Sequence, residues 1–202
     1  MAAPALQLPV SWEDYVAADE AFDGKLELLH GEVYAMAGGT PAHAHLTHNL
    51  AGIVYAALKG TRCHGTSNDQ RIGTPSGDAV YPDVTIRCAP PELRSPHTLL
   101  NPSAVIEVLS PTTEGWDRSG KLELYRSIPT MRHVLLVSYD AWRMTLVSRR
   151  DDGSWSYATA GPGERLVLEG VGMTVEVDEV YAGVEEVGGP ARDAVPRKPR
   201  TA

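Results

Sequence analysis

Hydrophobic and polar residues follow two periods along this chain, one typical of helices and the other of strands. Between residues 42 and 58 the apolar positions recur at helical spacing, which predicts one long core helix that ends near Gly60. These positions are Leu46, Leu50, Ile53, Val54, Ala57 and Leu58. A shorter helix is expected from Ser11 to about Ala21, because Ser11 suits a helix cap and two acidic residues follow in the first turn.

Short apolar runs bounded by turn residues predict the strands. Lys25–Leu29 and Glu32–Met36 are expected to form a hairpin around a turn at His30 and Gly31. Two further strands are expected over 62–65 and 69–72. The four prolines between residues 89 and 102 predict a loop instead.

The two strongest strand predictions cover Tyr81–Cys88 and Ala104–Leu109. The second run is apolar at nearly every position, as in a central strand that is buried on both faces. A helix over 113–128 and strands over 132–138, 142–149, 155–158, 166–168 and 173–175 complete the pattern. This order predicts an α/β domain of mixed α+β type over 1–186, followed by a tail over 187–202 that we expect to be disordered.

Composition restricts the classes of function. A length of 202 residues suits one domain with a sizeable core. The net charge of −8 argues against nucleic-acid binding through a broad basic surface, although acidic groups can gather around a metal ion. The sequence shows neither a long apolar run nor a signal-like N-terminus, so we expect a cytoplasmic protein in which Cys63 and Cys88 are free, buried thiols.

One carboxylate stands out inside the apolar run of 104–109. Glu107 is expected to be buried or to face a cleft, and a buried unpaired carboxylate costs several kcal/mol. It therefore needs a cation, and this segment alone fits an ion pair with Arg or Lys as well as it fits a metal ion.

Other polar residues near this run are ambiguous when taken singly. Asp83 follows Pro82 early in a strand, where it could merely cap a turn. Asp117, Lys121 and Tyr125 are spaced four residues apart, so they share one helical face, which alone would suggest a solvated stripe. Their order favours a common site, because a strand with Pro-Asp is followed by an apolar strand with a central Glu and then by a helix that carries a Lys.

Several stretches, taken in this order, resemble the Uma-two family of restriction endonucleases in the PD-(D/E)XK nuclease superfamily. The resemblance spans roughly residues 10 to 182. It rests on Glu27–Val33, on Gly38–Asn49 with its His43, on Tyr81–Val84, and on Val105–Thr112 followed by Asp117, Lys121 and Tyr125. It implies a restriction-endonuclease-like bent mixed sheet flanked by helices, and hydrolysis of nucleic-acid phosphodiester bonds, with DNA favoured over RNA.

The resemblance also implies roles for individual residues. Asp83 and Glu107 would bind Mg²⁺ or Mn²⁺ together with the backbone carbonyl of Val108, because these hard cations prefer oxygen ligands. The superfamily pattern places a lysine two residues after the Glu, where this chain has Leu109. Lys121 on the following helix resembles a migrated catalytic lysine that assists the attacking water.

The accessory residues implied in the same way lie in several segments. Glu32 is an additional ligand, His43 a contact to phosphate or water, and Asp69 a recurrent family acid. Asp117 and Tyr125 are expected to orient Lys121. Because cutting both strands of a duplex suits a two-fold dimer, we also expect a homodimer.

Three alternatives remain open at this point. His43, His45 and His48 could suggest zinc, but no HExxH or CxxC motif accompanies them, so a nuclease-site histidine with two surface histidines is favoured. A nuclease-fold protein that binds or regulates without cutting is the main alternative, because of the net charge and the displaced lysine. A nuclease acting on RNA is the other.

Overall fold

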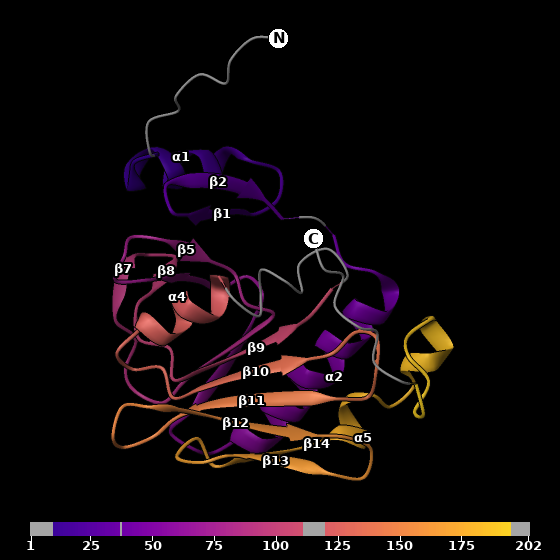
Figure 1. Cartoon of the computed structure of the whole chain (residues 1–202). Coiled ribbons are helices and arrows are strands. Elements are labelled where there is room, and N and C mark those ends of the chain that lie inside the picture. Colours follow the sequence, from indigo (N-terminus) through magenta and orange to yellow (C-terminus); the bar gives the residue numbers. More distant parts are fainter. Residues whose placement is uncertain (1–9, 37, 111–119, 195–202) are drawn as a thin grey trace.

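The computed structural model describes residues 10–36, 38–110 and 120–194 of the chain. Helices cover two six-stranded sheets, and the C-terminal part adds a two-stranded sheet (Figure 1). This architecture, with a helix and a hairpin at the N-terminal end, confirms the predicted mixed fold class. None of the described helices is long and apolar enough to cross a membrane.

The first sheet joins the N-terminal hairpin to short strands from the middle of the chain, in the order β2-β1-β5-β4-β8-β7. Its strands are β1 (Leu26–Leu29), β2 (Glu32–Ala35), β4 (Arg71–Gly73), β5 (Ala79–Val80), β7 (Leu93–Ser95) and β8 (Thr98–Leu99). The pair of β4 and β8 is parallel and the other neighbours are antiparallel. The predicted hairpin is confirmed, with His30 in a positive-φ conformation (53°) that the tight turn requires.

The second sheet holds the two strands that were predicted most strongly, in the order β12-β11-β10-β9-β6-β3. Its strands are β3 (His64–Ser67), β6 (Val84–Arg87), β9 (Ala104–Val108), β10 (His133–Val137), β11 (Met144–Arg149) and β12 (Trp155–Ala160). All five residues of β9 are buried, as the apolar run predicts. Because β9 and β10 run parallel, the chain must cross over between them, and the crossover includes α4 (Leu122–Ser127).

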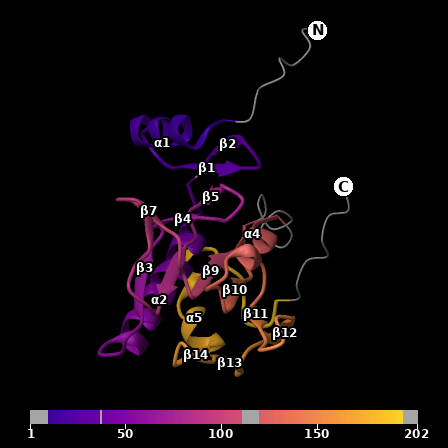
Figure 2. The same ribbon diagram turned by 90° about the vertical axis from the view of Figure 1, so that its left-hand side faces the viewer.

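Helices cover both faces of this second sheet. On one face, α2 (Pro41–Leu58) packs Leu46, Leu50 and Val54 into a core that also contains Ile106. On the other face, α4 packs its apolar side chains against Val105 and neighbouring strand residues. Figure 2 shows α2 and α4 on opposite sides of β9. The long helix predicted over 42–58 is therefore confirmed as a core helix.

The N-terminal helix α1 (Trp12–Ala21) lies over the hairpin and is tied to the first sheet by buried polar groups. Ser11 caps it as predicted, accepting a hydrogen bond from the Asp14 N–H at 3.1 Å. Asp19 forms an ion pair with Arg71 on β4 at 2.7 Å, and Arg71 is 1% exposed. Asp19 also accepts the Leu26 N–H at 2.8 Å, so one carboxylate joins the helix to both β1 and β4.

Two sequence predictions about the middle of the chain are wrong. The proline-rich segment 89–102 is not only loop, because it contains β7 and β8. Cys63 and Cys88 are not free thiols but form a disulfide. The physical reason is the register of β3 on β6, which places His64 opposite Arg87 and therefore brings the two flanking cysteines side by side.

The C-terminal part contains the two strands predicted over 166–168 and 173–175. Strands β13 (Arg165–Leu168) and β14 (Met173–Glu176) form their own sheet, and the short helices α5 (Val177–Val180) and η2 (Val184–Val187) follow. Residues 187–194, the described part of the expected tail, contact the domain through a hydrogen bond from the Trp142 Nε1–H to the Pro190 carbonyl at 2.9 Å. The predicted helix over 113–128 is described only from residue 120, and its observed α-helical part is α4.

Candidate active site

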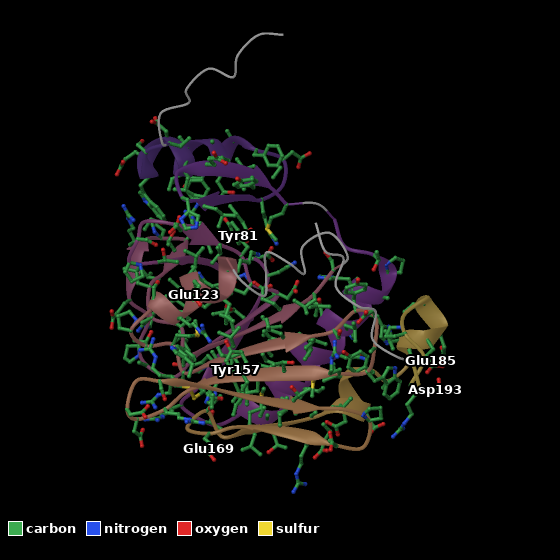
Figure 3. The ribbon with its side chains drawn as sticks, in the orientation of Figure 1. Tyr81, Glu123, Tyr157, Glu169, Glu185 and Asp193 are labelled. Carbon is green, nitrogen blue, oxygen red and sulfur yellow. A yellow bond between two sulfur atoms is a disulfide. The ribbon has the colours of Figure 1, made fainter. Side chains whose placement is uncertain are left out.

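The candidate site lies where the chain passes from the first sheet to the second. β5 belongs to the first sheet and β6 to the second, and only Tyr81, Pro82 and Asp83 connect them. Figure 3 shows Tyr81 between the N-terminal layer of α1, β1 and β2 and the body of the second sheet. Residues from both sheets can therefore meet at this crossing.

Glu107 is buried on the α4 side of the second sheet and is 5% exposed. Side chains alternate along a strand, so Glu107 shares a face with Val105, which belongs to the core beneath α4. The Tyr125 hydroxyl donates to Glu107 Oε1 at 2.5 Å, and Lys121 Nζ lies 3.5 Å from the same oxygen. The buried carboxylate thus has the cationic partner that its burial requires.

Lys121 also contacts a carboxylate that the sequence reasoning did not assign to the site. Its Nζ lies 2.9 Å from Glu27 Oε1 on β1, and both residues are buried, at 7% and 6% exposure. The same Glu27 oxygen accepts the Tyr81 N–H at 2.9 Å. The signal that could have revealed Glu27 is the same as for Glu107, a carboxylate inside a short apolar run.

Asp83 reaches the end of β9 from the neighbouring strand. Val84 pairs with Ile106, so Asp83 and Glu107 are the next positions out on the two strands. Asp83 Oδ2 accepts the Val108 N–H at 2.8 Å. In an extended strand the N–H and C=O of one residue point to the same side, so the Val108 carbonyl also faces the side of Asp83.

His43 approaches the same carboxylate from the start of α2. Thr40 caps this helix by accepting the His43 N–H at 3.2 Å, and Pro41 occupies its first turn. His43 Nε2 lies 3.5 Å from Asp83 Oδ2. The hydrogen bond to Asp83 raises the pKa of His43 above the usual 6.5, and partial burial opposes this rise. The charge of Asp83, a hydrogen bond with the Val108 backbone and the charge of Glu107 add to it.

The structure places Glu32 and Asp69 away from this cluster. Glu32 is exposed on β2 and accepts the Tyr34 hydroxyl at 2.5 Å, and Asp69 pairs with Lys25 at 2.8 Å while its side chain is 80% exposed. Asp117 lies outside the described residues.

The histidines of α2 do not form a zinc site with one another. His45 instead contacts the Ala182 carbonyl at 2.8 Å. Among the residues that the structure describes, no group of three or more His, Cys, Asp or Glu side chains is placed to hold a metal ion.

The donors at the crossing nevertheless fit Mg²⁺ or Mn²⁺ in chemistry. Mg²⁺ in proteins is bound through one or two carboxylates and keeps several waters, so it needs no cage of three acidic or histidine side chains. Asp83 offers Oδ1, which has no hydrogen-bond partner in the described ranges, and its side chain is 12% exposed. Glu107 and the Val108 carbonyl add oxygen donors at the same end of β9.

Comparisons with known proteins find two related sequences in Synechocystis. A protein of Synechocystis sp. described as uncharacterised is 33% identical over 183 residues, which cover 90% of this chain and 96% of that protein. A second uncharacterised Synechocystis protein is 28% identical over 145 residues, covering 70% of this chain and 82% of its own.

A solved structure shares the fold. It is described as a putative nuclease belonging to DUF820 from Anabaena variabilis, with a TM-score of 0.72, 10% identity, and coverage of 87% of this chain and 99% of that one. A family model described as "Uma2: Putative restriction endonuclease" matches residues 12–178, and we conclude that the chain belongs to this family.

Proposed function

We propose that the protein is a metal-dependent endonuclease that hydrolyses nucleic-acid phosphodiester bonds, with DNA as the favoured substrate. The observation that carries the proposal is the convergence of Asp83, Glu107 and Lys121, from three separate elements, at the junction of the two sheets. The fold and the family support it, because a nuclease family implies a nucleic-acid substrate.

Asp83, Glu107 and the Val108 carbonyl would hold the Mg²⁺ or Mn²⁺ ion. When bound, the ion would polarise the scissile phosphate and make a coordinated water more acidic. Lys121 Nζ, already held among carboxylates, would orient the attacking water or face a phosphate oxygen as a fixed positive charge. The hydrogen bond to Asp83 raises the pKa of His43, which favours the protonated ring that would donate to phosphate.

The acidic composition does not conflict with this chemistry. A net charge of −8 would repel a polyanion at long range, so binding would depend on the metal ion and on local cations rather than on a basic face. A two-fold dimer would present two such sites to the strands of a duplex, and the mass of the protein in solution tests this part of the proposal.

A non-cutting nucleic-acid-binding or regulatory protein is the second candidate. It is favoured by the contacts of Lys121, whose ammonium lies within 3.5 Å of two carboxylates and is therefore largely neutralised before any substrate arrives. Binding without cleavage would be the signature of this candidate.

The deciding experiment is cleavage of plasmid DNA and of a matched RNA in Mg²⁺, in Mn²⁺ and in EDTA. We expect metal-dependent cleavage that falls about 100-fold or more in Asp83→Asn and in Glu107→Gln, because each loses a ligand charge. The matched controls are Glu20→Gln near the end of α1 and Asp23→Asn just after it, two exposed acids whose variants should cut like the wild type. Equal background cutting by all five proteins would refute the proposal.

A further inference from the structure

We propose that Glu27 is a positioning residue of this site, which fixes both the lysine and the aspartate on which the reaction depends. The role rests on the proposed nuclease function. It is carried by one carboxylate oxygen, Glu27 Oε1, which lies 2.9 Å from Lys121 Nζ and also 2.9 Å from the Tyr81 backbone nitrogen.

The first effect of Glu27 is on Lys121. A lysine side chain is a flexible stem that carries a point charge, so its position depends on the groups around its ammonium. With Glu27 present, Nζ lies nearer to Glu27 than to Glu107, at 2.9 Å against 3.5 Å. Without Glu27, the ammonium would be drawn towards Glu107 and away from the position in which it can orient the attacking water.

The second effect is on Asp83, through the backbone. Glu27 holds the Tyr81 N–H, while the Tyr81 hydroxyl donates to Asp19 at 2.5 Å, so Tyr81 is fixed at both ends. Pro82 follows with a restricted φ and no N–H of its own. The backbone direction at Tyr81 therefore sets the position of Asp83, whose Oδ2 accepts the Val108 N–H.

A purely structural role explains these contacts less well. Helix α1 is already attached to the first sheet by the pair of Asp19 and Arg71, beside the Tyr81 hydroxyl rather than its backbone. A carboxylate in a strand whose four residues are all buried costs several kcal/mol unless it is paired. An apolar residue would serve the packing of β1 at no such cost, whereas only an anion can share Lys121 with Glu107.

The test compares Glu27→Ala, Glu27→Gln and the exposed control Glu20→Gln by steady-state cleavage in Mn²⁺, with thermal unfolding of each protein. We expect Glu27→Ala to lower kcat about 10–100-fold, as loss of a group that orients a catalytic residue does. KM and the half-saturating Mn²⁺ concentration should stay within about threefold. Glu27→Gln keeps an acceptor for Tyr81 and should lose less than Glu27→Ala, while Glu20→Gln should match the wild type.

Each other outcome overturns the role in a distinguishable way. Wild-type kcat in Glu27→Ala, per folded molecule, would show that Glu27 only stabilises the fold, and the nuclease proposal would stand. Full recovery at high Mn²⁺ would make Glu27 a metal ligand instead. If Glu27→Ala does not fold, Glu27→Gln decides alone, since it preserves size and shape. A wild-type protein without metal-dependent cleavage would overturn the nuclease function and this role with it.

Discussion

Replacement of Arg71 by methionine tests how helix α1 is held on the first sheet. Arg71 is 1% exposed, pairs with Asp19 at 2.7 Å, and donates from Nε to the Thr98 hydroxyl at 2.8 Å. Methionine fills a similar volume without charge, so Arg71→Met removes the electrostatic partner and leaves little cavity. The Asp19 carboxylate would then stay buried without a cation.

The magnitude follows from the burial of the pair. Breaking a buried ion pair by removing one partner costs about 3–5 kcal/mol, because an uncompensated charge remains. Asp19 would keep the Leu26 N–H and the Tyr81 hydroxyl as donors, so we expect the lower end, about 3 kcal/mol. That is a large part of the roughly 5–15 kcal/mol that stabilises a typical domain.

Urea unfolding at neutral pH, followed by tryptophan fluorescence and circular dichroism, measures the loss. The control is Arg165→Met, which breaks an exposed pair with Glu176 at 3.7 Å and should cost less than about 1 kcal/mol. Asp19→Asn added to Arg71→Met removes the stranded charge and should restore more than half of the stability. Equal losses in Arg71→Met and Arg165→Met, or no recovery in the double variant, would refute the reasoning.

Three further predictions concern the site and the disulfide. The His43 ring should titrate above pH 6.5 by NMR in metal-free buffer, and its pKa should fall in Asp83→Asn. Its contribution to the free energy of unfolding, measured against His43→Gln, should be full below pH 6.5 and lost as the pH rises through the folded pKa. A wild-type ring that titrates at or below pH 6.5, or an unchanged pKa in Asp83→Asn, would contradict this. Without reductant, the denatured protein should show no reactive thiol, and two reactive thiols would disprove the bond between Cys63 and Cys88. Reduction of this bond should lower the free energy of unfolding by about 2–4 kcal/mol. Tyr125→Phe should lower kcat about tenfold by removing a hydrogen bond to the buried carboxylate of β9, and an unchanged kcat would count against that contact.

Much of the fold could be predicted from the sequence because its strongest signals are local. The helical period over 42–58 and the apolar run at 104–109 depend on burial alone, and both elements are confirmed. Placing Asp83, Glu107 and Lys121 together needed more than periodicity. Each is ambiguous alone, and the family resemblance supplied the order in which they were combined.

The features that the sequence did not reveal depend on contacts between distant segments. Glu27 lies in a short apolar run, as Glu107 does, but it alternates with leucines in β1, and such alternation equally suggests solvent exposure. The contacts with Lys121 and Tyr81, which come from distant segments, show that it is buried. β7 and β8 form within a proline-rich segment because β8 pairs with β4 and β7 pairs with β8. The disulfide requires the register of β3 on β6, which residue spacing does not encode.

The central claim is that one divalent ion binds between Asp83 and Glu107. Diffraction from crystals soaked in Mn²⁺, with data collected at the manganese absorption edge, tests it most directly. The account predicts an anomalous peak within about 2.0–2.6 Å of an oxygen from each carboxylate, lost in Asp83→Asn. A fully occupied peak elsewhere, or none at the end of β9 at saturating Mn²⁺, would contradict it.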